Sequence, residues 1–224
     1  MSTLQTLSRG LQVLEIVSRS SPGMTIADIA QSLGVHRAIA YRLVATLEEH
    51  LLVVRDNEGR ICLGGGIVAL SEKYQPQLRA AAVPVLRILA EECGATAFLC
   101  IAQADECVAV EVAEPERPLL KVSYRVGTRH PVSKGAAGLA IAMQRPPQRG
   151  DSGELKNARS DGYAMTRGQL QEGATGVAAP LGRSVRSGLS TEACIGVVAM
   201  HSLDTEQAAA AVLRHRDRLV AAIG

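Results

Sequence analysis

The stretch that decides the fold is TIADIAQSLGVHRAIAYRLVATLEE, residues 25–49. It begins with Thr25, a residue type that caps helices, and then repeats apolar residues at helical spacing. Those residues are Ile26, Ile29, Ala30 and Leu33. Gly34 interrupts the repeat, and a second helical pattern follows through Val35, Ile39, Leu43 and Leu47. Two helices joined by a short turn that contains glycine form a helix-turn-helix.

The second helix has a polar face that could enter a DNA major groove. The residues predicted to point away from its apolar stripe are His36, Arg37, Tyr41, Arg42 and Ala45. An ordinary corner in a helical domain is the alternative, because such corners are common. Residues 25–49 alone do not decide between the two.

The residues that follow favour DNA binding. Residues 51–55 and 60–63 are short apolar runs separated by Asp-Asn-Glu-Gly, which predicts a β-hairpin. A hairpin directly after a recognition helix is a wing, and Arg55 and Arg60 flank its tip, where they could reach phosphates. Residues 4–19 predict a preceding helix. Its expected apolar stripe is Leu7, Leu11, Leu14 and Val17.

Composition narrows the class of protein. The chain has 224 residues, 47% of them hydrophobic and 21% charged, which argues against disorder. Its net charge of +2 excludes a generally basic nucleic-acid coat, so the case for DNA binding depends on where the arginines lie. Aromatic residues make up 2% of the chain, which leaves little for a base-stacking platform. Double-stranded DNA is therefore the expected nucleic-acid partner.

The five cysteines show no Cys-x-x-Cys spacing, so neither a disulfide framework nor a zinc finger is predicted. The first ten residues lack the build of a secretory signal, and no apolar run is long enough to span a bilayer. We expect a cytoplasmic protein with reduced thiols, no membrane contact, no metal and no cofactor.

Beyond the wing, the glycines at 64–66 mark a composition break and begin a linker; a phosphate-binding loop is the alternative, but no GxxxxGK[ST] pattern follows. Helices are predicted at residues 67–74, 76–93, 133–143 and 205–223. The predicted strands are residues 96–102, 107–113, 119–124, 177–181 and 194–200, with a polar turn at 182–192. Residues 144–161 are expected to form a loop. This order predicts an α+β sensor-like domain with an antiparallel sheet.

Several segments in order resemble the IclR family of bacterial transcriptional regulators. In the N-terminal half these are SRGLQVLEIV (8–17) and TIADIAQSLGVHRAIAYRLVATLE (25–48). In the C-terminal half they are VGTRHPVSKGAAGLA (126–140), DGYAMTRGQLQEGATGVAAPL (161–181) and ACIGVVAM (193–200). The resemblance implies a winged helix-turn-helix DNA-binding domain at 1–64, a linker helix at 65–76 and a GAF-like effector-binding and oligomerisation domain at 77–224.

The resemblance also implies a homodimer or homotetramer on palindromic operator DNA, with a small organic or aromatic acid as effector. The candidate DNA-binding residues are Thr25, His36, Arg37, Ala38, Tyr41, Arg42, Arg55 and Arg60. Two of them have structural alternatives. Tyr41 could pack on the first helix, and Arg42 could pair with Glu48 or Glu49 at the surface.

By motif position, the effector site would be lined by Leu119, Val122, His130, Ala136, Ala137, Gly176, Ala199 and His201. The two histidines could hold an anionic effector, or a metal if a carboxylate joins them, or could simply cap strand ends in solvent. The chain departs from the family at Arg37-Ala38-Ile39, where Lys-Ser-Thr is frequent, and at Gly176, where cysteine is familiar. It also departs at Ser133, Gly135 and Leu139 of the effector motif, and its 144–161 connection is shorter.

Two further hypotheses remain. A ligand-blind repressor with a vestigial pocket is favoured by the short connection. An enzyme would have to use Cys107, Cys194 and the two histidines, and no catalytic signature accompanies them. Both cysteines lie in apolar strand patterns where buried, inert thiols are expected. We therefore predict that the protein is not an enzyme.

Overall fold

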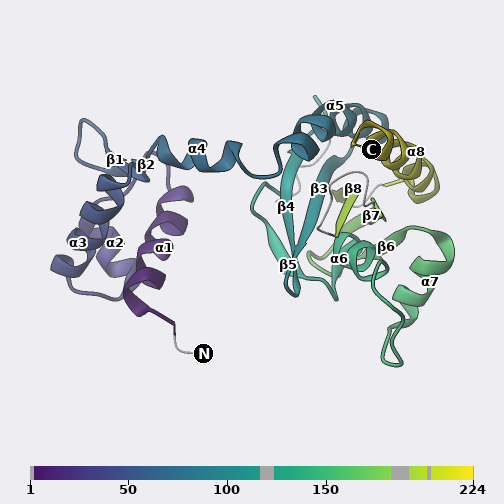
Figure 1. The fold of residues 1–224 in the computed structure, drawn as a ribbon, viewed down its shortest axis with the longest axis horizontal. Helices are drawn as coiled ribbons and strands as arrows, with labels where there is room; N and C mark the ends of the chain where they lie inside the picture. Colours follow the sequence, from purple (N-terminus) through teal and green to yellow (C-terminus); the bar gives the residue numbers. More distant parts are fainter. Residues whose placement is uncertain (1–2, 117–123, 183–191, 201–202, 224) are drawn as a thin grey trace. The chain divides into compact units, whose positions relative to one another are not determined.

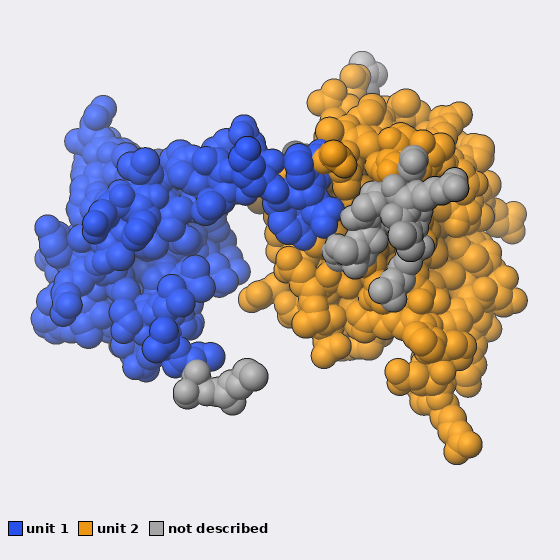
Figure 2. All heavy atoms as spheres, viewed as in Figure 1, with its two compact units in different colours: residues 1–76 blue, residues 77–224 orange. Residues whose placement is uncertain are grey.

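The computed structural model describes residues 3–116, 124–182, 192–200 and 203–223, which fall into two compact units, Met1–Pro76 and Gln77–Gly224 (Figure 2). Most of the predicted strand at 119–124 and of the turn at 182–192 therefore lies outside the described residues. No helix formed by the described part of the chain is long and apolar enough to cross a membrane.

The first unit is a winged helix-turn-helix (Figure 1). Its elements are α1 (Gln5–Ser18), α2 (Ile26–Leu33), α3 (Arg37–Glu49), β1 (Val53–Arg55), β2 (Ile61–Leu63) and α4 (Gly66–Glu72). Thr25 and Asp28 form a capping box at the start of α2, and Gly34 ends that helix with a φ of 63°. The wing strands are antiparallel, with Val54 opposite Cys62. The predicted helices and the wing of this unit are therefore confirmed.

The predicted apolar stripes of α1 and α3 are confirmed only in part, since Val17, Leu43 and Leu47 are buried. Leu7 is 59% exposed and Leu11 53% exposed, while the core of this unit takes Val13 and Val17 from α1. In α3, Ile39 is 42% exposed. The buried residues of α3 are Ala40, Leu43, Val44 and Leu47. Both helices carry more than one row of apolar residues at helical spacing, and packing against the other elements selects between the rows.

The second unit contains an antiparallel sheet of six strands among the described residues, in the order β5-β4-β3-β8-β7-β6 (Figure 1). The strands are β3 (Thr96–Gln103), β4 (Glu106–Ala113), β5 (Arg129–Pro131), β6 (Ala164–Arg167), β7 (Ala174–Pro180) and β8 (Ala193–Met200). The helices are α5 (Pro76–Cys93), α6 (Gly135–Ala142), α7 (Gly153–Asp161) and α8 (Thr205–Ile223). The predicted α+β class with an antiparallel sheet is confirmed.

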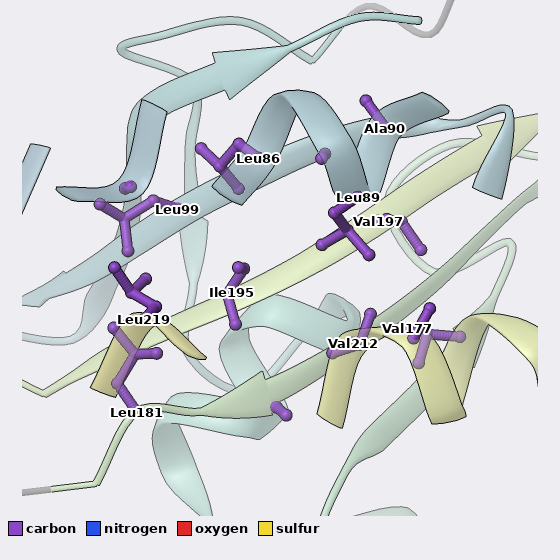
Figure 3. Packing of buried hydrophobic residues seen from close by; sticks show 14 of the residues in the cluster. Leu86, Leu89, Ala90, Leu99, Val177, Leu181, Ile195, Val197, Val212 and Leu219 are labelled. Atoms are coloured by element: carbon purple, nitrogen blue, oxygen red, sulfur yellow. The ribbon is translucent and has the colours of Figure 1, made fainter. Parts of the chain in front are cut away.

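Helices cover both faces of this sheet. The main core lies between the sheet and α5 with α8, and includes Leu86, Leu99, Ile195 and Leu219 (Figure 3). A second cluster lies on the opposite face beneath α6 and α7. Because successive strand residues point to opposite faces, even-numbered residues of β8 such as Cys194 face α6 and odd-numbered ones face α5 and α8.

The prediction of a loop over residues 144–161 is wrong for its second half, which forms α7. The Ser152 side chain caps this helix by accepting the Leu155 backbone N–H at 3.2 Å, and Gly162 ends it in the left-handed conformation. Leu155 and Ala158 are buried on one side. The pattern was obscured by the prolines and glycines that precede it. The short strands β5 and β6 were also missed.

A charged contact ties α5 to α8. Glu92 accepts a hydrogen bond from the buried His215 at 2.9 Å and also pairs with Arg214. His215, burial and Arg214 act on the Glu92 carboxyl in that order of size, and together they lower its pKa. A carboxyl whose pKa is lower in the folded state stabilises the fold above its unfolded pKa, and this contribution is lost as pH falls through the folded pKa.

Glu92→Gln is therefore expected to lower the melting temperature at neutral pH and to have a much smaller effect well below the carboxyl's ordinary pKa of 4.5. Melting curves of both proteins across the acid range measure this. An equal difference between the two proteins at every pH would show that the charge of Glu92 does not stabilise the contact.

Candidate DNA-binding surface and effector cavity

The outer face of α3 presents two arginines without carboxylate partners. Arg37 and Arg42 are exposed, and no ion pair among the described residues involves either. The buried side of the helix, centred on Leu43 and Val44, fixes which face is outward. Among the described residues, Arg42 forms no ion pair with Glu48 or Glu49, and Glu48 pairs with Arg55 instead. Two guanidinium groups on the exposed surface of α3 suit binding to a polyanion.

The cap of α3 leaves one imidazole nitrogen available. His36 is the N-cap residue, and its Nδ1 accepts the Ala38 backbone N–H at 3.4 Å. An accepting Nδ1 carries no proton, so in the neutral ring the proton is on Nε2, which can donate. Ala38 is exposed beside it. Thr25 is less available, because its hydroxyl donates to Asp28 Oδ2 at 2.6 Å within the capping box.

The wing arginines are paired within the protein. Arg55 lies 2.9 Å from Glu48, and its guanidinium carbon is 5.8 Å from the centre of the Tyr41 ring. The contact holds the exposed Tyr41 to the wing. Arg60 pairs with Asp56 at 2.8 Å, and the hydrogen bond from its backbone N–H is the largest cause that lowers the pKa of Asp56. These pairs would have to open before either arginine could bind phosphate.

A cavity of about 320 Å³ lies on the α6 face of the sheet in the second unit. This volume is within the range of small-molecule sites, which are mostly apolar with a few polar groups. The lining residues are Phe98, Tyr124, Thr128, Arg129, His130, Gly135, Ala136, Ala137, Thr166, Gln169, Leu170, Gln171, Ala174, Gly176 and Val198.

The predicted effector-site residues only partly coincide with this lining. The structure brings together His130, Ala136, Ala137 and Gly176 around the cavity. The prediction was wrong for Ala199, which packs against the main core on the opposite face of the sheet, while its neighbour Val198 lines the cavity. Leu119, Val122 and His201 lie outside the described residues. Strand alternation was the signal that separates Val198 from Ala199.

A chain of hydrogen bonds connects the cavity wall to the sheet. His130 Nδ1 lies 3.1 Å from the Pro131 carbonyl oxygen, so it must carry a proton and donate. His130 Nε2 lies 3.3 Å from the Tyr124 hydroxyl, which in turn lies 3.2 Å from the Cys100 thiol. His130 is 7% exposed, so it does not simply cap a strand end in solvent.

The start of α6 is closed by Gln169. Its side-chain oxygen accepts the Gly135 backbone N–H at 2.8 Å, and its amide donates to Glu154 at 2.7 Å. Leu170 covers the same point, because a Cβ built on Gly135 would lie 2.5 Å from Leu170 Cδ1. Sequence reasoning missed both residues. They belong to a turn after β6, where no periodic pattern marks a side chain that faces inward.

Charge at the cavity is limited. Arg129 is the lining residue with a fixed positive charge, and its guanidinium lies 3.8 Å from the Glu106 carboxylate. Within the described ranges, no group of three or more His, Cys, Asp or Glu side chains is arranged to hold a metal ion. Cys107 and Cys194 are fully buried behind the lining. The cavity is therefore mostly apolar. Its polar groups come from the side chains of Tyr124, His130, two threonines and two glutamines.

The sequence was compared with protein families and with curated proteins. Residues 6–57 match the IclR helix-turn-helix domain. The acetate operon repressor of Salmonella typhimurium is 28% identical over 145 residues, covering 63% of this chain and 53% of that protein. The transcriptional repressor IclR of Escherichia coli is 25% identical with the same coverage. The chain thus spans about half the length of the curated relatives it matches.

Solved structures resemble the whole chain. An IclR homolog from Microbacterium hydrocarbonoxydans, complexed with 4-hydroxybenzoate, has a TM-score of 0.78 at 21% identity and covers 98% of this chain and 99% of its own. An IclR transcriptional regulator from Alicyclobacillus acidocaldarius has a TM-score of 0.76 at 22% identity and covers both chains completely. At 21–22% sequence identity, the similarity to these structures establishes the fold alone. Residues 6–57 thus carry an IclR helix-turn-helix domain, and the relatives and solved structures that the chain resembles include IclR-type transcriptional regulators.

Proposed function

We propose that this protein regulates transcription by binding double-stranded operator DNA, and that a small organic or aromatic acid in its cavity changes that binding. Residues 1–64 would bind DNA, residues 65–76 would act as the linker, and residues 77–224 would bind the effector and hold a homodimer or homotetramer together. The observation that carries the proposal is the exposed surface of α3, where Arg37 and Arg42 have no carboxylate partner among the described residues.

The DNA-binding part follows from charge placement. The first unit presents its free arginines on the helix that follows the helix-turn-helix corner, where major-groove contact is made in this motif. The wing arginines would add phosphate contacts only after Glu48 and Asp56 release them. Two half-sites would supply the discrimination that one winged helix lacks, which supports an oligomer.

The effector part is supported by the cavity. Its apolar wall of Phe98, Ala136 and Val198 suits a small ring or alkyl group, while Tyr124, His130 and Thr166 offer polar contacts. The 4-hydroxybenzoate bound by the Microbacterium homolog is a ligand of this class. An effector would alter DNA affinity only by binding more tightly to one of two DNA-binding states.

A ligand-blind repressor is the second candidate. One observation favours it. The Gly135 backbone N–H at the start of α6 already donates to the Gln169 side chain, and this is the end of a helix that would attract an acid. Leu170 also covers this end of the cavity. In this case the cavity would have no regulatory role.

Capture of sheared genomic DNA by the purified protein tests DNA binding. We expect a small set of enriched duplexes that bind more tightly than scrambled duplexes of the same composition, with affinity that falls steeply as salt rises. Equal binding of enriched and scrambled duplexes would contradict the proposal.

Narrowing the cavity should remove acid binding. A Cβ at Gly176 would lie 3.3 Å from Ala136 Cβ and 3.9 Å from Thr166 Oγ1, so Gly176→Ala reduces the space beside the polar wall. We expect acids that raise the melting temperature of the native protein to lose at least tenfold in affinity in this variant, about 1.4 kcal/mol. Gly150→Ala is the control, because a Cβ there meets nothing within 4 Å. If no acid shifts the native protein, the ligand-blind candidate is favoured.

A further inference from the structure

Three thiols meet beneath the cavity wall. Cys100 on β3, Cys107 on β4 and Cys194 on β8 belong to the cluster on the α6 face, and all three are fully buried. The Cys100 thiol lies 3.2 Å from the Tyr124 hydroxyl, and the Cys194 thiol donates a hydrogen bond to the Ala137 carbonyl oxygen at 3.4 Å. The three strands are neighbours in the sheet, which explains how thiols distant in the sequence come together.

Cys100 and Cys194 are directly opposite each other in the sheet. The Ala102 backbone N–H donates to the opposite Glu192 carbonyl at 2.8 Å, so by alternation Cys100 and Cys194 also form a hydrogen-bonded pair. In such pairs the Cα atoms are about 5.5 Å apart, within the range of about 4.4–6.8 Å that a disulfide spans. Cys107 instead pairs with Ala102, two residues along β3.

Cys100 also contacts a proton relay. Its thiol lies 3.2 Å from the Tyr124 hydroxyl, which lies 3.3 Å from His130 Nε2. In the neutral state the Cys100 S–H donates to the Tyr124 oxygen, and the Tyr124 O–H donates to Nε2. Moving both protons one step along the chain gives a Cys100 thiolate and a His130 imidazolium, and every hydrogen bond remains. The Pro131 carbonyl still accepts from Nδ1.

From this arrangement we propose that Cys100 is a peroxide-reactive thiol, that Tyr124 and His130 position its proton, and that oxidation joins it to Cys194. The thiol is a modification site behind the cavity wall, next to the lining residue Tyr124. Cys107 is opposite Ala102 and therefore diagonal to Cys100, so it is not part of the product.

The oxidant is hydrogen peroxide, a small neutral molecule. The Cys100 thiolate attacks one peroxide oxygen, the O–O bond breaks, and the leaving hydroxide takes the proton from the His130 imidazolium to form water. The Cys194 sulfur then attacks the sulfenic sulfur of Cys100. The S–O bond breaks, and the hydroxide leaves as water with the Cys194 thiol proton. Two thiols lose two electrons in total, and one peroxide gains them.

The electrostatic environment shifts the pKa values of Cys100 and Cys194 in opposite directions. Burial opposes a charge on Cys100, but hydrogen bonds from Cys107, Cys194 and Tyr124, together with the charge of His130, hold the pKa of Cys100 below its ordinary value of 9.0. Burial raises the pKa of Cys194 well above that value. These four groups are the titratable side chains that contact Cys100 or act on its charge. One low-pKa thiol beside a protonated one is the arrangement of an attacking and a resolving cysteine.

Peptide mapping of the whole native protein after peroxide treatment tests the proposal. We expect the peptides that contain Cys100 and Cys194 to be linked and to lose two hydrogens in mass, and reductant to reverse this. Cys100→Ser should abolish the linkage, while Cys107→Ser should retain it. A linkage between Cys100 and Cys107 would overturn the proposal. The proposal would also be overturned if Cys100 and Cys194 stayed reduced under conditions that oxidise the half-buried Cys62.

The relay is tested by the pH profile of the linkage rate. In the native protein the rate should be nearly independent of pH around neutrality. In Tyr124→Phe, which keeps the ring but loses the hydroxyl, the rate should be about tenfold lower at neutral pH and should rise towards the ordinary thiol pKa. A melting temperature close to native verifies that the variant is folded. A native-like rate and profile in this variant would overturn the role of Tyr124. None of these readouts requires DNA or an effector, so failure of the regulatory function would not affect them.

Discussion

Replacing Gly64 with alanine is expected to unfold much of the winged helix. A Cβ at this buried position would lie 2.2 Å from the Leu51 carbonyl oxygen and 3.0 Å from the Val53 backbone nitrogen. These atoms cannot turn aside as a side chain can, because the Gly64 N–H donates to Leu52 at 2.9 Å and holds the two segments together. Overpacking of this kind costs about 3 kcal/mol or more, a large part of the stability of a small domain.

Hydrogen exchange measures the effect separately in each unit. In Gly64→Ala, peptides from residues 4–63 should lose protection, while peptides from β3 and β8 should keep it. Gly65→Ala is a matched control, because a Cβ on the adjacent residue meets nothing within 4 Å. Equal protection in the two variants would mean that the close approach at Gly64 is relieved without cost.

Arg42→Ala is expected to weaken binding to a captured operator duplex by about tenfold to a hundredfold, because it removes an exposed guanidinium from the side of α3 that we propose contacts DNA. Arg55→Ala should have a much smaller effect, since Arg55 is already paired with Glu48 at 2.9 Å and must lose that pair to reach DNA. The two substitutions remove the same charge from the same unit.

Fluorescence anisotropy with a labelled duplex at several salt concentrations compares these variants. The loss in Arg42→Ala should be accompanied by a shallower dependence of affinity on salt, by roughly one counterion. Similar losses for the two variants would show that net charge matters and that the position of Arg42 on α3 does not.

Local signals were sufficient for the first unit. Thr25 and Gly34 mark the ends of α2 with a cap and a left-handed turn, and the Asp-Asn-Glu-Gly segment marks the wing. These features depend on a few adjacent residues, so they can be recognised in the sequence. The choice between the Leu7 and Val13 rows of α1 could not be recognised in this way, because it depends on the helices packed against them.

The cavity shows the same division. The sequence motifs located Ala136, Ala137 and Gly176, because α6 and β7 are strongly patterned elements. Gln169 and Leu170 lie in a turn and reach the cavity only through the tertiary fold. The face of the sheet on which Ala199 lies depends on the register of β8. The pattern of small residues in β8 does not determine that register.

The central claim is that filling the cavity changes DNA binding, and the direct measurement is operator affinity with and without a saturating acid identified by thermal shift. We predict a change of about fivefold or more in the dissociation constant, and an equal change in acid affinity when DNA is present, because coupling between two sites is reciprocal. In Gly176→Ala the same acid should leave DNA affinity unchanged. An acid that stabilises the native protein through the cavity but leaves operator affinity unaltered would contradict the account.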